Sequence, residues 1–182
     1  MVGDHMGRLT GKKILMVVGE KNYNQQEYEH LHDLFLEEGA VVAVASQGKG
    51  KALGRLGGYV VPQLSIAEAK PQDYDAIILI GGYGAYAFLW DNVQLHELLR
   101  EAQQLNKLLV AASVSTVTLA NAGLLQGKNA TVYPDYNAAV ILSEKGANHV
   151  YQSVVVDDNI ITSNHPRKVK ELGKTIVARL SE

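Results

Sequence analysis

Three polar turns in the sequence contain residue types that can perform chemistry. Each turn directly follows a short apolar run: residues 19–23, which lead to Glu27; residues 81–85, rich in glycine; and Ser113, Val114 and Ser115. In an open parallel sheet, ligands bind beyond the carboxyl ends of the strands. We therefore expect the functional site at these turns.

The turn at Ser113 has the layout of a nucleophile elbow. In such an elbow a tight strand-to-helix turn lifts one side chain above the sheet and points helix N–H groups at it. Gly81 and Gly82 allow a backbone N–H to approach the same point, which would give two donors for a developing oxyanion. On the local pattern alone, a helix cap is the alternative role for Ser113.

The elements that must position these turns alternate along the chain. Helical patterns, with apolar residues on one face, lie between short apolar runs typical of strands buried on both faces. The runs cover residues 14–18, 41–45, 76–80 and 108–112. The alternation predicts an α/β three-layer sandwich, with a mainly parallel sheet and helices on both faces.

The second half of the chain continues this pattern with shorter elements. We expect a strand at 130–133, a short helix at 137–143, a hairpin over 154–161 and a final helix that begins near Pro166. A glycine-rich basic segment at 48–58 resembles a phosphate loop superficially but lacks the Gly-Lys-Ser/Thr ending. We interpret it as a mobile surface loop before a strand at 59–61.

Length and composition narrow the class of protein. With 182 residues, we expect one domain over residues 13–182, preceded by a polar tail at 1–12 in which we interpret residues 3–6 as derived from an expression vector. Seventeen basic and nineteen acidic residues argue against nucleic-acid binding. The absence of cysteine excludes a disulfide, a thiolate metal site and a cysteine nucleophile.

The sequence also predicts the compartment. Residues 1–13 lack the apolar core of a signal peptide, so we expect a cytoplasmic protein. The uncharged stretch 108–125 is interrupted by polar residues and divides into a strand and a helix, so no membrane association is expected.

Several segments together resemble the ThiJ/PfpI family, which includes intracellular protease I and has a class I glutamine-amidotransferase-like (flavodoxin-like) fold. The resemblance extends over nearly the whole chain, from about residue 13 to residue 180. The segments that carry it are 107–125 with Gly127 and Lys128, 74–85 with Leu89 and Trp90, 130–134 and 154–166.

The elbow departs from the family pattern Ala-Ile-Cys-His-Gly-Pro. Ser113 takes the cysteine position and Val114 the histidine position, while Ser115 and Thr116 replace the glycine and proline. An engineered cysteine-to-serine change would account for Ser113 alone, so we interpret the elbow as one that has drifted in a natural protein.

The resemblance implies roles for further residues. It places a carboxylate beside the nucleophile at Glu27, with Glu20 as a weaker candidate, and an oxyanion N–H at Gly82. It also places Tyr133 and His165 near the pocket. The alternative roles are an exposed first-turn glutamate for either Glu27 or Glu20, and a helix-end residue for His165.

The changed elbow has a mechanistic consequence. A serine hydroxyl needs a positioned general base, and Val114 supplies none where the family has histidine. We therefore expect loss of the family's thiol-dependent peptidase, glyoxalase or deglycase chemistry and a non-catalytic role: oligomeric, small-molecule-binding or chaperone-like. The alternative is a weak serine hydrolase in which Ser113 attacks and Glu27 or His165 is the base.

Other sites are not indicated. His30 and His32 point in different directions on a helix, and His96 and His149 have no ligand partners at useful spacing, so we predict no metal and no cofactor. The turn at 81–85 resembles a dinucleotide fingerprint, but the first strand's turn lacks Gly-X-Gly-X-X-Gly; a Rossmann domain is therefore the second choice of fold. The family resemblance implies a homo-oligomer with a small-molecule or peptide ligand.

Overall fold

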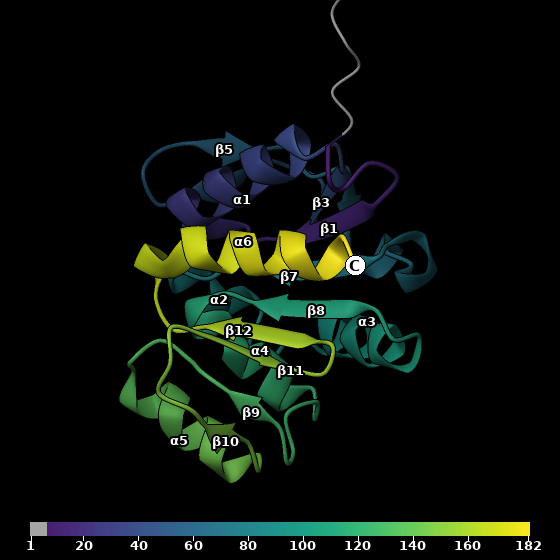
Figure 1. Cartoon of the computed structure of the whole chain (residues 1–182). Helices are drawn as coiled ribbons and strands as arrows, with labels where there is room; N and C mark the ends of the chain where they lie inside the picture. The colour runs from purple at the N-terminus through teal and green to yellow at the C-terminus, as the bar shows by residue number, and fades with distance from the viewer. Residues whose placement is uncertain (1–6) are drawn as a thin grey trace, which may run out of the picture.

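A seven-stranded sheet forms the centre of the protein (Figure 1). Its strands are β1 (Lys13–Val17), β3 (Val41–Ser46), β6 (Leu64–Ser65), β7 (Ala76–Leu79), β8 (Leu108–Ala111), β11 (Val154–Asp157) and β12 (Ile160–Ser163). The strand order is β11-β12-β8-β7-β1-β3-β6, and only the β11–β12 pair is antiparallel. The predicted sheet and the predicted hairpin are both confirmed.

The structure is a computed structural model that describes residues 7–182. The expectation for residues 3–6 therefore lies outside the described residues. Residues 7–12 belong to the folded domain and not to a separate tail, because Leu9 is fully buried and its N–H donates to Glu38 O at 2.7 Å.

Helices cover both faces of the sheet (Figure 1). α1 (Gln25–Glu37) and α6 (Val169–Leu180) pack together on one face, while α3 (Val93–Gln104) and α4 (Thr116–Asn121) lie on the other. Alternate residues of β1 supply both cores: Ile14 faces one cluster and Leu15 faces the other. This explains why the central strands are continuous apolar runs.

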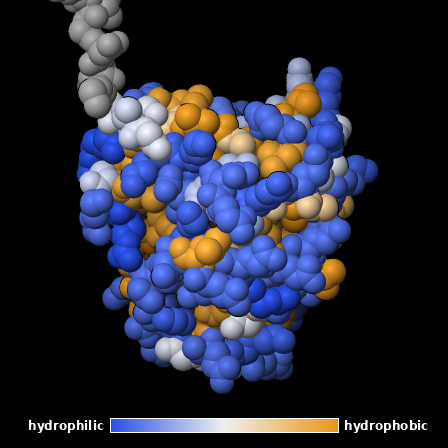
Figure 2. All heavy atoms as spheres, turned by 90° about the vertical axis from the view of Figure 1, so that its right-hand side faces the viewer, coloured by the Kyte–Doolittle hydropathy of each residue, from blue (hydrophilic) through white to orange (hydrophobic). Residues whose placement is uncertain are grey.

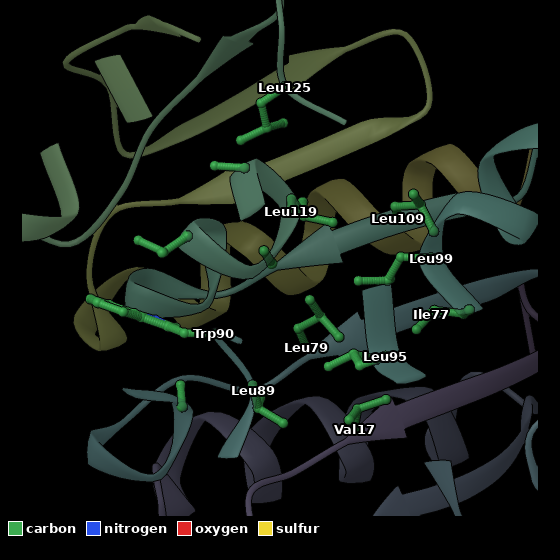
Figure 3. Packing of buried hydrophobic residues seen from close by; sticks show 14 of the residues in the cluster. Val17, Ile77, Leu79, Leu89, Trp90, Leu95, Leu99, Leu109, Leu119 and Leu125 are labelled. Carbon is green, nitrogen blue, oxygen red and sulfur yellow. The ribbon is translucent and has the colours of Figure 1, made fainter. Parts of the chain in front are cut away.

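The core on the α3 side lies next to the elbow. Leu95 and Leu99 of α3 and Leu119 of α4 pack with Leu79 and Leu109 of the sheet (Figure 3). This buried layer fixes the ends of β7 and β8, from which the glycine turn and the Ser113 turn leave the sheet.

Side-chain caps determine where the helices begin. Asn24 Oδ1 accepts the Glu27 N–H at 2.9 Å at the start of α1, and Asp135 Oδ1 accepts the Ala138 N–H at 2.8 Å at the start of α5 (Tyr136–Glu144). Such caps satisfy N–H groups that have no partner within the helix. The cap at Asn24 places Glu27 in the first turn of α1.

The glycine-rich segment at 48–58 differs from its prediction. It contains β4 (Ala52–Gly54), which pairs in parallel with β2 (Lys21–Tyr23) and antiparallel with β5 (Tyr59–Val60). The expected surface loop thus contains one short strand of a small second sheet beside the first polar turn, and most of its remaining residues form turns and bends. A Cβ at Gly54 would lie 2.6 Å from Gln25 Oε1, so a larger residue there would displace the Gln25 side chain.

The boundaries of two other predicted elements differ from those in the structure. The strand expected at 130–133 is only β9 (Asn129–Ala130), paired with β10 (Asn148–His149), and residues 131–133 leave the ladder to approach Ser113. The last helix is preceded by a 3₁₀ turn at Pro166–Lys168.

The surface seen in Figure 2 is mostly hydrophilic, with small separate apolar patches. In the part of the chain that the structure describes, no helix is long and apolar enough to span a bilayer.

Candidate functional site

Ser113 lies at the carboxyl end of β8 in a strained backbone conformation. Its φ is +50°, in the left-handed region, which costs a non-glycine residue about 1–2 kcal/mol. Its N–H donates to Ser163 Oγ at 3.3 Å, and its carbonyl accepts the Tyr133 N–H at 3.3 Å. The side chain caps neither the 3₁₀ turn Ser113–Ser115 nor α4, so the capping alternative is wrong. The turn therefore has the geometry expected of an elbow.

Glu27 meets Ser113 beneath the turn. Its Oε1 accepts the Ser113 hydroxyl at 3.4 Å and the Gly81 N–H at 3.1 Å. The residue is fully buried, and within residues 7–182 its Oε2 has no hydrogen-bond partner. Burial raises the pKa of the Glu27 carboxyl to about 7, although the hydrogen bonds from Ser113 and Gly81 act in the opposite direction.

The weaker carboxylate candidate, Glu20, lies elsewhere. It is in the turn after β1, and its backbone N–H donates to Gln47 Oε1 at 2.8 Å. The structure thus brings Glu27, and not Glu20, into contact with Ser113. The buried position of Glu27 also excludes the alternative of an exposed first-turn glutamate for this residue.

The two glycines of the second turn have different tasks. The Gly81 N–H is committed to Glu27, and a Cβ at Gly81 would lie 2.8 Å from Ala112 O. Gly82 caps α2 (Tyr83–Phe88) with φ +98° and lines the pocket. Of the two glycines, Gly82, to which the family resemblance assigns the oxyanion N–H, remains the candidate for contact with a bound molecule.

A pocket of about 100 Å³ opens over Ser113. It is lined by Asn24, Arg55, Gly82, Tyr83, Tyr86, Ser113, Val114, Tyr133 and Pro166. Its wall is largely aromatic, and the Tyr86 hydroxyl donates to Asp135 Oδ2 at 3.2 Å. Ser113 itself is only 1% exposed, so a ligand must be small to reach its hydroxyl.

Val114, in the position where the family resemblance expects histidine, presents an apolar side chain to this pocket. Its carbonyl accepts the indole N–H of Trp90 at 2.9 Å. Trp90 therefore supports the elbow from the core side, and its ring lies against that of Tyr86 with centroids 4.2 Å apart.

His165 lies near the pocket, but its hydrogen bond is with the backbone of the following turn and not with Ser113. Its Nδ1 accepts the Arg167 N–H at 3.1 Å at the start of the 3₁₀ turn, and its ring lies 5.2 Å from that of Tyr133. Burial, followed by the charges of Arg167 and Lys168, lowers the pKa of His165. Within residues 7–182, no hydrogen bond joins it to Ser113; the helix-end interpretation of His165 is therefore the one that the structure supports.

The comparisons with known proteins agree with this architecture. A family model described as the DJ-1/PfpI family matches residues 12–179. The chain belongs to the DJ-1/PfpI family. An uncharacterized protein of Methanocaldococcus jannaschii is 36% identical over 174 residues, which is 96% of this chain and 85% of that protein.

Solved DJ-1/PfpI structures resemble the whole fold. A ThiJ/PfpI domain protein from Brachyspira murdochii is 28% identical, with a TM-score of 0.88 over 94% of this chain and 97% of the other. DJ-1beta from Drosophila melanogaster is 26% identical, with a TM-score of 0.82 over 93% of this chain and 90% of the other.

Sequence reasoning missed three polar residues that line this DJ-1/PfpI pocket, Asn24, Tyr86 and Arg55, of which Arg55 is the charged one. It follows β4 in the segment that we had interpreted as a surface loop, and its guanidinium carbon lies 4.9 Å from the centre of the Tyr83 ring. The sequence held no clear signal for this strand, because Ala52, Leu53 and Gly54 do not alternate between apolar and polar types and the most apolar of them, Leu53, is the exposed one.

Side chains that could bind a metal ion are scattered in this DJ-1/PfpI chain. Over residues 7–182, no three side chains of His, Cys, Asp or Glu come together in an arrangement that could hold a metal ion. The chemistry that the pocket offers is therefore that of the Ser113 hydroxyl, the Glu27 carboxyl, the Arg55 cation and the tyrosine rings.

Proposed function

We propose that this DJ-1/PfpI-family protein binds a small molecule in the pocket over Ser113 and does not perform the thiol-dependent chemistry that the family resemblance implies. The observation that carries the proposal is the pairing of Ser113 with Glu27 alone. A hydroxyl group becomes a competent nucleophile when a positioned base removes its proton during attack.

Glu27 is a poor base in this position for two reasons. Its Oε1 already accepts the Gly81 N–H at 3.1 Å, and such a bond stabilises the carboxylate without bringing the Ser113 proton closer. The Ser113 contact is long at 3.4 Å. Val114 offers no second proton acceptor, since its side chain is apolar.

The lining of the pocket and the backbone around Ser113 support the binding of a small molecule. Aromatic side chains with a few polar groups in a concave site are typical of small-molecule pockets. The strained Ser113 backbone and the close approach at Gly81 keep the pocket shaped, since strain of this kind persists only when surrounding contacts enforce it.

A serine-directed fluorophosphonate tests the proposal. We expect no covalent adduct at Ser113, measured by mass spectrometry on protein whose thermal melting confirms that it is folded. The Ser113→Ala variant is the matched control. An adduct at Ser113, together with hydrolysis of an activated ester that disappears in Ser113→Ala, would contradict a non-catalytic role.

One observation favours a second candidate, a weak serine hydrolase. The Glu27 pKa of about 7 lies near neutral pH, where a general base is most effective. In this reaction Glu27 accepts the hydroxyl proton while Ser113 Oγ bonds to the carbonyl carbon, and the tetrahedral adduct expels the leaving group, which takes up that proton. Water, deprotonated by Glu27, then attacks the acyl group on Ser113; the acid leaves, and Glu27 returns the proton to Ser113 Oγ. The same labelling experiment distinguishes the two functions.

We also propose that the protein forms a homo-oligomer. Leu53, Leu56, Tyr59 and Val61, in and around the small sheet of β2, β4 and β5, are 46–66% exposed, and exposed apolar side chains that cluster often mark an interface. Light scattering coupled to size-exclusion chromatography tests this, and a single species of 19.8 kDa would contradict it.

A further inference from the structure

Arg55 is an unpaired cation at the pocket rim. Its side chain is exposed, lies over the Tyr83 ring at 4.9 Å and lines the same pocket as Ser113. The ion pairs formed within residues 7–182 join other residues and leave Arg55 without an acidic partner. The guanidinium is therefore available to an anion from outside the chain.

The backbone holds Arg55 in place. Its N–H donates to Tyr23 O at 3.1 Å, and Gln25 Oε1 accepts the N–H groups of Leu56 at 3.2 Å and Gly58 at 2.9 Å. Gln25 belongs to α1, the helix that carries Glu27. The cation and the buried carboxyl are thus positioned by one helix, and binding an anion would require little ordering of the turn.

The charge balance of the pocket favours a negative ligand. Among its lining residues Arg55 alone carries a full charge, and no acidic side chain is in contact with the cavity. Two acids lie behind the lining residues: Glu27, beneath the floor, whose Oε2 has no hydrogen-bond partner among the described residues, and Asp135, whose Oδ2 accepts the Tyr86 hydroxyl at 3.2 Å.

The size of the pocket limits the ligand further. Its volume is about 100 Å³, and Ser113 at its floor is only 1% exposed. The part of a ligand that reaches the Ser113 hydroxyl must therefore be small. A carboxylate matches the planar fork of one guanidinium, whereas a phosphate dianion usually gathers more than one positive group.

We propose that the pocket binds a small carboxylate monoanion of about two to four carbon atoms, with its carboxylate at Arg55 and its other end toward Ser113. The inference rests on the proposed function, because it names the ligand class of that binding pocket.

The absence of cysteine allows a sharp test. Ser113→Cys introduces the only thiol in the chain, at the floor of the pocket. Its alkylation by iodoacetate and by iodoacetamide compares two probes of nearly equal size that differ in charge. Each rate is measured at constant ionic strength in three backgrounds: Arg55 intact, Arg55→Gln, and the control Arg179→Gln on α6.

We expect the iodoacetate-to-iodoacetamide rate ratio to fall roughly fivefold in Arg55→Gln, which corresponds to about 1 kcal/mol. Arg179→Gln should leave the ratio unchanged. Sodium propionate should protect the thiol from iodoacetamide in a saturable way, and propionamide should protect it less.

The remaining outcomes separate this inference from the proposed function. If Arg55→Gln leaves the rate ratio unchanged and propionamide protects as well as propionate, the pocket binds small molecules but the anion inference fails. Protection by inorganic phosphate and not by propionate would also overturn the carboxylate class. If neither reagent reaches the thiol in folded protein, both the inference and the proposed binding function fail.

Discussion

The Ser113 hydroxyl and the Gly81 N–H donate to the same oxygen of Glu27, at 3.4 Å and 3.1 Å. The second carboxyl oxygen is buried without a partner in the described part of the chain. An ionised carboxylate is destabilised when it is buried and one of its oxygens has no hydrogen-bond partner. The folded protein therefore favours the protonated, neutral form of Glu27. The Ser113–Glu27 pair therefore links the chemistry of the elbow to the stability of the fold.

The first prediction concerns pH and Glu27. The pKa of this carboxyl is about 7 in the folded protein against 4.5 for the ordinary group. Between these values the folded state holds a proton that the unfolded state has lost, so stability falls as pH rises. We expect a loss of roughly 3 kcal/mol from pH 4.5 to above pH 7, as follows from a shift of this size.

Urea unfolding of Glu27→Gln at several pH values checks this prediction. The amide has no proton to lose, so its free energy of unfolding should lack the decline that the unaltered protein shows. Glu37→Gln, an exposed change on the same helix, should keep the decline. Parallel pH profiles for Glu27→Gln and the unaltered protein would show that Glu27 is not the group responsible.

Why Glu27 could be singled out only by resemblance is clear from its surroundings. Asn24 followed three residues later by Glu27 is a helix-start signature and indicates a first-turn position. It does not indicate that the carboxyl turns inward, because that depends on where β7 and β8 end. Glu20 lies closer to the end of the same apolar run but lacks this helix-start pattern, and only the assembled sheet shows which of the two carboxyls reaches Ser113.

The sheet itself was predictable for a different reason. The residues of β7 and β8 are buried on both faces, which makes them apolar runs that require no knowledge of the partner strand. β4 lies at the surface and contains glycine, so its sequence gives only a weak indication of a strand. Arg55 was missed because the strand before it was missed.

The second prediction tests the close approach at Gly81. In Gly81→Ala the new methyl group would collide first with Ser113 Oγ and would lie 2.8 Å from both Ala112 O and Glu27 Oε1. Crowding of this kind costs about 1–3 kcal/mol, and it should displace the Glu27 carboxyl from the Gly81 N–H. We expect a lower melting temperature, measured by circular dichroism.

Gly48→Ala is the matched control, because a Cβ there meets no atom within 4 Å. Its melting temperature should be unchanged or slightly higher. An equal effect of both substitutions would mean that lost backbone freedom, and not contact with Glu27, accounts for the result at Gly81.

The third prediction concerns the support of the elbow by Trp90. Trp90→Phe keeps an aromatic ring beside Tyr86 but removes the N–H that donates to Val114 O at 2.9 Å. Val114 O keeps the hydrogen bond from the Thr116 N–H, so the substitution removes one of its two donors, and the net loss of one such hydrogen bond costs about 0.5–1.5 kcal/mol. We expect this loss in chemical unfolding followed by circular dichroism. Tyr136→Phe, which removes a polar group from a side chain that is 83% exposed, should change stability little.

The last prediction restores the residue types of the family pattern at the elbow. The double variant Ser113→Cys, Val114→His places a thiol at the strained position and an imidazole beside it. A cysteine next to an imidazole ionises below its ordinary pKa of about 8.5. We expect the pH midpoint of its alkylation by iodoacetamide to lie below that of the exposed control Ser143→Cys.

Turnover of methylglyoxal and of peptides should then separate the two functions of the pocket. Activity that appears in the double variant and not in the unaltered protein would locate the defect at Ser113 and Val114, because the scaffold around them is otherwise the same. If the unaltered protein is equally active and Ser113→Ala abolishes that activity, the Ser113–Glu27 pair is a working catalyst. The 3.4 Å contact would then shorten when substrate binds, as hydrogen bonds to catalytic groups often do.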